Sequence, residues 1–375
     1  MTTQMTSGKK SVLGFFAMRL PLFATILIIL IIALIIGNFV ISGASYLSWE
    51  FLTGNPRNMN TEGGIFPAIY GTVLLVLIMT LAAVPVGTIT AIYLTEYARQ
   101  NSWFARTIRF AVNTLAGVPS IVFGLFGLGF FIQTVGSQID EVRWNQRVAT
   151  TRSELELPAS PLSDGKIATV EQVQEYLNNS EYDWSEEISR LNTFPRGGSA
   201  RVNNDIVERY LSNSVELHWG KPNILWAALT LALLTLPVVI VSVEESLRTV
   251  PRDIREASLA LGATKLETIR KVVVPNSLTG ILTGSILAIG RGAGEVAPIL
   301  FTGAVYSLQK LPTSLNDQFM HLGYHLYILA TQSPDVEATQ PLQYATTLVL
   351  LGLTLALNFS AILLRSRIRR RRQLA

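Results

Sequence analysis

Long uncharged stretches dominate the hydrophobic pattern of this chain. Six of them, separated by polar segments, run over residues 20–49, 63–95, 110–139, 222–243, 272–290 and 338–364. Each can supply the roughly 20 consecutive apolar residues that a helix needs to cross the hydrocarbon core of a bilayer. The pattern therefore predicts an all-α polytopic membrane protein with six transmembrane helices.

Composition supports the same class. The chain has 375 residues, of which 49% are hydrophobic and 15% charged, whereas soluble domains are about 25% charged. Lys9 and Lys10 precede the first apolar stretch as in a signal peptide, but that stretch is longer than an h-region and lacks a small-x-small exit. We therefore expect a retained first transmembrane helix over 20–43. A further apolar piece, 296–308, is too short to span and should end the fifth helix and enter a loop or re-entrant segment.

The basic residues predict the orientation. Lys and Arg number six each in 244–271 and 365–375 and three each in 1–19 and 95–109, against one each in 44–62 and 301–340. Short basic loops stay in the cytoplasm. We therefore expect a cytoplasmic N-terminus over 1–19 and a basic cytoplasmic tail over 365–375. The tail abuts an apolar helix and has no aromatic partners, which argues against nucleic-acid binding.

A polar insertion separates the third and fourth predicted helices. Residues 136–221 carry 14 acidic and 9 basic side chains, which predicts a soluble, extracytoplasmic segment. Three short helical patterns within it, at 169–178, 185–191 and from Asn204, are separated by Pro and Gly. The insertion is either a docking surface for an external partner or an elaboration without such a role.

A short amphipathic helix is predicted after the fourth span. Ile254, Ala257 and Leu261 form one apolar stripe, while Arg252, Arg255 and Glu256 face elsewhere. Pro251 suits the start of this helix and Gly262 its end, in the left-handed conformation. A helix this short is marginal alone and must pack against something. The pattern fits docking into a partner's groove, with an ordinary interfacial connector as the alternative.

Two charges stand inside the fifth apolar region. Arg291 and Glu295 are spaced i, i+4 and can pair. Each charge at bilayer depth costs roughly 2.5 to 3.5 kcal/mol, so such groups usually mark a pathway or a partner. Arg suits an anionic substrate because its planar fork donates bidentately to phosphate-like oxygens and stays protonated. A helix-locking ion pair is the structural alternative.

Several small residues and prolines are predicted to serve packing. Gly280, Gly284, Ala288 and Gly292 form a small-xxx-small ridge. Other positions expected to be structural, through close helix approach or kinks, are Gly117, Pro119, Pro237, Pro275, Gly290 and Gly294. The run 292–297 imitates a dinucleotide fingerprint, but no strand precedes it, so we reject that interpretation.

The sequence predicts neither a catalytic site nor a cofactor. It holds no Gly-x-x-x-x-Gly-Lys-Ser/Thr, so we expect no nucleotide site of its own. Cysteine is absent, which excludes disulfides and thiolate metal sites. His321 and His325 are spaced i, i+4 without an evident third ligand, so we expect no metal site there. Energy for any transport must then come from another chain.

The amphipathic segment also resembles a known family. Glu256, Ala257, Gly262 and Pro275 match the EAA loop of ATP-binding-cassette (ABC) importer permeases in register, with Ser258 at the third position. The runs 113–124 and 236–251 are similar to permeases of phosphate importers, and 290–302 and 324–331 are similar to the PstA type among them. Of these, the Gly-Arg-Gly-Ala-Gly-Glu-Val-Ala-Pro-Ile-Leu-Phe-Thr run is the most discriminating. The 136–221 insertion departs from the short loop usual in that family.

The resemblance implies a type I ABC importer (MetI-like) permease fold over about 66–364. It implies that 252–275 is the coupling loop, whose contact with the ATPase would involve Arg252, Ile254, Glu256, Ala257, Leu261 and Gly262. It also implies a PstC-type permease as heterodimer partner, two PstB-type ATP-binding subunits and a PstS-type phosphate-binding protein. We thus expect a phosphate permease subunit in the bacterial inner membrane, with Arg291 and Glu295 in its pathway.

Two alternatives remain open on the sequence. A permease for another oxyanion, such as sulfate, molybdate or phosphonate, would share the same architecture. An ion-coupled secondary transporter or channel would need coupling-ion sites of its own within the helices, and no inverted repeat is obvious.

Overall fold

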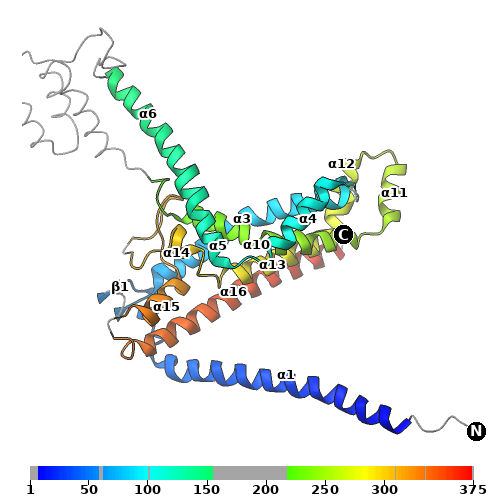
Figure 1. Cartoon of the computed structure of the whole chain (residues 1–375), viewed down its shortest axis with the longest axis horizontal. Helices are drawn as coiled ribbons and strands as arrows, with labels where there is room; N and C mark the ends of the chain where they lie inside the picture. The colour runs from blue at the N-terminus through cyan, green and yellow to red at the C-terminus, as the bar shows by residue number, and fades with distance from the viewer. Residues whose placement is uncertain are drawn as a thin grey trace, which may run out of the picture.

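The computed structural model describes residues 7–58, 62–99, 102–154, 218–308, 310–333 and 335–373. Its longer helices are α1 (Ser7–Gly43), α3 (Phe66–Ile92), α4 (Trp103–Leu115), α6 (Ser137–Glu154), α10 (Ile224–Arg248), α13 (Val274–Gly292) and α16 (Gln340–Gln373). The shorter ones are α2 (Trp49–Thr53), α5 (Ser120–Phe126), α11 (Arg252–Ala260), α12 (Lys265–Thr268), α14 (Ile299–Thr302) and α15 (Leu322–Thr331). The described chain is almost wholly helical (Figure 1).

Among the described residues, three π-helical segments continue other helices, and one small hairpin interrupts the helical pattern. The π segments are η3 (Tyr93–Tyr97) after α3, η4 (Gly127–Gly136) between α5 and α6, and η5 (Ile269–Val273) between α12 and α13. The antiparallel strands are β1 (Pro56–Arg57) and β2 (Glu62–Gly63). The hairpin and α15 lie at one end of the bundle, and α11 and α12 lie at the other, called the α11 end below (Figure 1).

Six helical segments of the described chain are long and apolar enough to cross a bilayer, which confirms the predicted number and the all-α polytopic class. They run over Arg19–Tyr46, Phe66–Tyr97, Ser120–Arg147, Ile224–Arg248, Lys265–Gly292 and Gln340–Arg370. Several boundaries differ from the sequence pattern, most of all the start of the third span. The third span starts at Ser120, because 110–115 belongs to α4 and Pro119 begins a new helix. The sixth continues as a helix into the basic tail.

The centre of the bundle is α10. It is the most buried of the six spans, and it packs between α3 and α13. One apolar cluster joins Leu75 and Met79 of α3 to Leu231 and Leu234 of α10. Because α10 is enclosed by protein, its interior Pro237 is buried within the bundle.

Small residues bring α13 close to α10, as the predicted ridge requires. A Cβ on Gly280 would lie 2.0 Å from Cβ of Ser246, and one on Gly284 would lie 3.3 Å from Cβ of Ser242. The contact is reinforced by the Ser246 hydroxyl, which donates to the Ser277 carbonyl at 3.1 Å. Close approach of backbones, rather than side-chain volume, therefore holds this pair of helices together.

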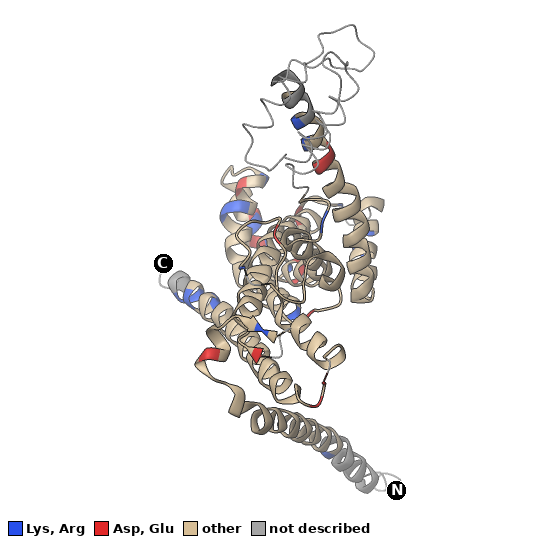
Figure 2. Cartoon of the chain, turned by 90° about the vertical axis from the view of Figure 1, so that its left-hand side faces the viewer, with Lys and Arg blue, Asp and Glu red and all other residues tan. Residues whose placement is uncertain are grey.

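The first span stands apart from the bundle. None of its most hydrophobic window is buried in the chain, and α1 meets α16 near its own end, where Phe39 and Tyr344 lie 5.6 Å apart between ring centroids. Figure 2 shows its described length as almost uniformly uncharged. A helix that is apolar all round needs lipid or another subunit on its exposed faces.

The described ends of the 136–221 insertion are held together by hydrogen bonds and a cation–π contact. Asp140, on α6, is buried and accepts from the backbone N–H of Trp219 at 3.2 Å and of Gly220 at 2.6 Å. The Arg143 guanidinium lies 5.6 Å from the centroid of the Trp219 ring. The insertion thus leaves and rejoins the bundle at a single closed base. The three helices expected at 169–178, 185–191 and from Asn204 lie outside the described residues.

Two buried histidines occupy α15, outside the six spanning segments. His321 caps the helix, since its Nδ1 accepts from the Gly323 N–H at 3.1 Å, and His325 follows one turn later. Burial lowers the pKa of both His321 and His325 from 6.5 to about 4. Both rings are therefore neutral at pH 7.

This burial predicts acid-sensitive stability. Between pH 6.5 and 4 the histidines of the unfolded chain bind protons that those of the folded chain do not. The free energy of unfolding is therefore highest above pH 6.5 and falls as the pH drops toward 4. The loss should be of the order of 3 kcal/mol per histidine. Thermal unfolding of the purified protein in detergent, measured from pH 7.5 to 4.5, should show this slope, and His325→Leu should flatten it. An unchanged slope in His325→Leu, equal to that of the partly exposed control His218→Gln, would contradict the assignment.

Candidate functional site

The two charges of the fifth span lie at a helix end. α13 stops at Gly292, and the chain then turns, with the Glu295 N–H donating to the Gly292 carbonyl at 3.3 Å. The turn leaves Arg291 Nε and Glu295 Oε1 3.6 Å apart, with the two side chains 37% and 23% exposed. They pair as the i, i+4 spacing predicts, although Glu295 is no longer on the helix. Whether the pair serves transport remains a prediction.

Neighbouring helices place this pair near the middle of the bundle. A Cβ on Gly292 would lie 2.3 Å from Sδ of Met79 and 4.0 Å from Cγ2 of Thr235. Met79 and Thr235 stand near the midpoints of α3 and α10. Arg291 therefore lies at the end of its own span but beside the middles of α3 and α10, and a charge costs most near the middle of a bilayer. The Arg291 side chain is half-buried rather than enclosed, so it is accessible from the surface of this chain.

A second helix break lies beside the first. Between α4 and α5 the chain is non-helical over 116–119, and Val118 packs against the cluster that contains Met79 and Ala293. Further along, a Cβ on Gly124 would lie 2.9 Å from Cα of Pro298. Interrupted helices at membrane depth are tolerated where they are covered by protein or line a cavity, and transporters use them at substrate sites.

Helix α11 is held away from the bundle, and none of its residues is buried. Ile254 is 44% and Leu261 is 89% exposed, and Ala257 between them is exposed too. The apolar stripe that the sequence predicts therefore has no cover within the described chain. Arg252 and Glu256 are also exposed. A helix this short with a bare apolar stripe is suited to docking on another protein.

The end of α11 has the geometry expected of a glycine stop. Gly262 has φ +86°, which confirms the predicted left-handed conformation. Its N–H donates to the Leu259 carbonyl at 3.0 Å, and the Ala263 N–H donates to the Ser258 carbonyl at 3.2 Å. These two bonds form a Schellman cap. α12 starts next, with a capping box between Thr264 and Glu267.

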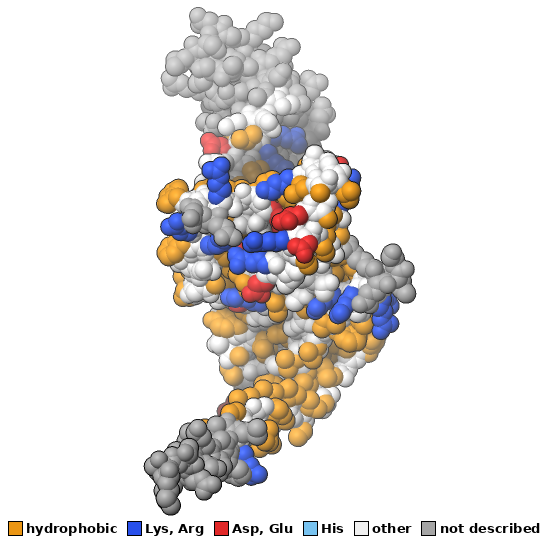
Figure 3. Space-filling view, turned by 90° about the vertical axis from the view of Figure 1, so that its right-hand side faces the viewer, with side chains coloured by type: hydrophobic (Ala, Val, Ile, Leu, Met, Phe, Trp, Pro, Cys, Tyr) orange, Lys and Arg blue, Asp and Glu red, His pale blue; other side chains and the backbone are white. Residues whose placement is uncertain are grey.

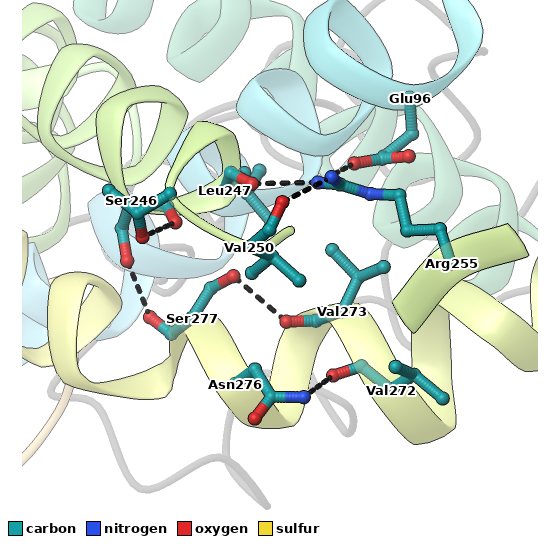
Figure 4. Close-up of polar contacts among 10 residues, drawn as sticks. Glu96, Ser246, Leu247, Val250, Arg255, Val272, Val273, Asn276 and Ser277 are labelled. Carbon is teal, nitrogen blue, oxygen red and sulfur yellow. Dashed lines mark hydrogen bonds and ion pairs between the residues drawn. The ribbon is translucent and has the colours of Figure 1, made fainter. Parts of the chain in front are cut away.

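Sequence reasoning missed how α11 is anchored. Arg255 reaches across to Glu96 of η3, 3.0 Å away, and also donates to the Leu247 carbonyl at 2.7 Å (Figure 4). Ser258 shares a 3.0 Å hydrogen bond with Thr268 of α12. The signal in the sequence was weak, because Glu96 is one of several charges beside a long apolar run.

A second ionic cluster lies beside the first at the α11 end. Glu244 of α10 has a side chain only 12% exposed and binds Arg109 of α4 at 3.0 Å and Arg248 at 2.6 Å. Arg109 also donates to the Leu94 carbonyl of η3 at 3.1 Å. Figure 3 shows Lys and Arg side chains gathered on this end with acidic side chains among them.

The residues predicted to be structural divide into two groups. Pro119 caps α5, Pro275 opens α13 within the helix that begins at Lys265, and a Cβ on Gly290 would lie 3.1 Å from Oδ1 of Asn358. Gly117 and Gly294 differ, because a Cβ on either would meet only a nearby backbone carbonyl, at 3.5 and 3.9 Å. Close helix packing is therefore not what these two glycines provide in the described chain. Both lie in the breaks beside the Arg291 pair.

No group of three or more His, Asp or Glu that could hold a metal ion occurs in the described part of the chain. His321 and His325 are buried on α15, and their burial leaves no open side for a third ligand from solvent. The chemistry that the described charges offer is anion binding and ion pairing.

The fold and this arrangement define a class: a polytopic transport subunit that presents a bare amphipathic helix to a partner. Residues 83–373 match the family of binding-protein-dependent transport system inner membrane components, and the chain belongs to that family. It is a membrane permease subunit rather than an enzyme.

Similar proteins are permeases by name. The probable ABC transporter permease protein YqgI of Bacillus subtilis is 25% identical over 325 residues, 82% of each chain. The phosphate transport system permease protein PstA of Yersinia pestis is 29% identical over 328 residues, 87% of this chain and 81% of that protein. PstA 1 of Mycobacterium tuberculosis (strain H37Rv) is 30% identical over 238 residues, 64% of this chain and 50% of that protein.

Proposed function

We propose that this chain is a permease subunit of an ATP-driven importer for inorganic phosphate. The observation that carries the proposal is the Arg291–Glu295 pair, which lies beside the middles of α3 and α10 and next to two helix breaks. The names of the PstA relatives support phosphate as the substrate. The partners would be a PstC-type permease completing the pathway, two PstB-type ATP-binding subunits and a PstS-type phosphate-binding protein outside.

The proposed orientation puts both termini and α11 in the cytoplasm. The basic loops on that side support it, since short basic segments are retained there. The 136–221 insertion would then lie outside the cell. Its pinned base would hold it above the pathway, on the side where a phosphate-binding protein approaches.

In the proposed mechanism, ATP binding closes the two ATPase subunits and displaces α11. The displacement passes into the bundle and changes the side to which the pathway opens. Phosphate released outside then passes Arg291, whose guanidinium offers a planar pair of N–H donors to two phosphate oxygens. Glu295 holds the guanidinium and keeps the empty site near neutral, which limits the cost of the charge at this depth.

Another oxyanion is the alternative substrate within this class, because an arginine recognises tetrahedral anions by a shared geometry. The deciding experiment is uptake of labelled phosphate by the complete complex in proteoliposomes, with sulfate and arsenate as competitors. We expect ATP-dependent uptake that excess arsenate suppresses and excess sulfate leaves nearly unchanged. Stronger competition by sulfate would reassign the substrate, and uptake without ATP would point to a channel or an ion-coupled transporter.

A further inference from the structure

We propose that η3, the π-helical end of α3, is a second input through which α11 drives the pathway, with Arg255 as the connecting side chain and Glu96 as its receiver. The inference rests on the proposed function, and it adds positioning residues that no part of the EAA resemblance includes. It differs from transmission along α13 alone, which the chain order of α11, α12 and α13 suggests.

The first observation is a gap. A cavity of about 560 Å³ separates α11 from the bundle and is lined by η3, α4 and the end of α10 together with α11 itself. Because no residue of α11 is buried, apolar packing does not fix the helix to the described bundle. The Arg255 side chain crosses this gap (Figure 4). A push on α11 therefore reaches η3 through a polar contact.

The second observation is that the contact between Arg255 and Glu96 is partly buried and is supported by further hydrogen bonds. Arg255 and Glu96 side chains are 19% and 11% exposed, with Nη2 and Oε1 3.0 Å apart. The guanidinium also donates to the carbonyl of Leu247, at the end of α10, and to that of Val250, just after it. A partly buried pair with additional hydrogen bonds is held in one geometry, whereas exposed pairs contribute little. Arg255 thus ties α11 to both α3 and α10.

The third observation is convergence on η3. Besides Arg255, two cations from other elements bind this five-residue segment: Arg109 of α4 donates to the Leu94 carbonyl, and Lys265 of α12 lies 4.9 Å from the centroid of the Tyr97 ring. Contacts from α4, α11 and α12 therefore meet on one turn. A π-helical segment is an uncommon conformation that recurs at functional sites, and here it is where these contacts converge.

The fourth observation is that α3 connects η3 to the neighbourhood of Arg291. η3 continues α3 without a break, and a helix transmits an axial or tilting displacement along its length. At its middle, α3 presents Met79 to Gly292, the residue next to Arg291. A close-packed contact between a side chain and a glycine leaves no slack to absorb movement. Displacement of η3 should therefore change the position of Arg291 relative to the α4–α5 break.

The test is a charge swap at the joint. Complexes carrying Glu96→Arg, Arg255→Glu or both are reconstituted in proteoliposomes, and phosphate transported per ATP hydrolysed is measured along with co-purification of the ATPase. We expect each single variant to assemble and to lose at least about fivefold in this ratio, since each leaves a partly buried charge unpaired. The double variant restores the pair and should recover much of the ratio. Glu62→Ala, which removes an exposed hydrogen bond from Asn58 in the hairpin at the opposite end of the bundle, is the control and should keep the wild-type ratio.

A second measurement does not depend on the substrate. Hydrogen exchange over residues 90–97 is compared between the resting complex and the complex trapped with ATP and vanadate. Protection should change on trapping in wild type and not in Arg255→Glu. Normal coupling and a normal exchange change in assembled single variants would overturn the inference. Absent phosphate uptake in wild type, with the exchange change intact, would instead count against phosphate as the substrate.

Discussion

Replacing Arg291 with alanine is expected to lower ATP-driven phosphate uptake about ten- to hundredfold, because hydrogen bonds to a charged group contribute roughly 1.5 to 3 kcal/mol. The guanidinium is the one cationic group at this depth among the described residues of the spanning helices. Arg291→Lys keeps the charge and loses the planar fork, so its uptake should fall between those of alanine and wild type. The measurement is initial uptake rate against phosphate concentration in the reconstituted complex.

A matched control is Arg367→Ala, in the basic end of α16, which should leave uptake unchanged. The alternative role, an ion pair that only locks a helix end, is separated by Arg291→Ala/Glu295→Ala. If the pair is structural, removing both charges should restore assembly and uptake together, since no charge remains unpaired. If Arg291 binds the anion, assembly recovers while uptake stays low. Wild-type uptake in assembled Arg291→Ala would remove the pathway assignment.

The six spans were predictable because membrane helices obey a local rule. About 20 apolar residues suffice to identify each one, and no knowledge of its neighbours is needed. The same rule misplaced the start of the third span. Residues 110–115 are as uncharged as those after Pro119, so the pattern shows one stretch where the chain forms two helices.

The end of α11 was also predictable, since a glycine in the left-handed conformation is a local feature. The Glu96–Arg255 contact was not. Its residues are 159 positions apart, and each looks by itself like an ordinary charge at a membrane surface. The π-helical form of η3 has no sequence signature in Tyr93–Tyr97. Local chemistry thus identified the residues at the α11 end, and tertiary structure decides which of them meet.

Placing a charge on the bare stripe of α11 is expected to release the ATPase subunits. Burying a leucine stabilises a contact by about 1.5 to 3 kcal/mol, and Leu261 is 89% exposed in this chain. Leu261→Asp and Ile254→Asp should each lower retention of the ATPase on the purified permease about tenfold or more. Uptake should fall in parallel. Retention is measured by co-purification across a range of ATPase concentrations.

The control for this prediction is Leu315→Asp. Leu315 is 49% exposed, lies in the loop before α15 at the opposite end of the bundle, and should be neutral for ATPase retention. Full retention in both α11 variants would show that another surface docks the ATPase. Loss of retention in the Leu315 variant as well would mean that an added charge acts through folding rather than docking.

A milder substitution at Gly262, which caps α11, tests the same contact with the ATPase. A Cβ at position 262 meets no atom within 4 Å, so Gly262→Ala adds only the cost of holding alanine at φ +86°. That cost is about 1 to 2 kcal/mol, and it should fray the last turn that carries Leu261. Retention should therefore fall less than in Leu261→Asp, while ATP hydrolysed per phosphate transported rises. Glu256→Ala leaves the cap and the stripe intact, so a rise in that ratio with normal retention would assign Glu256 to coupling rather than to attachment.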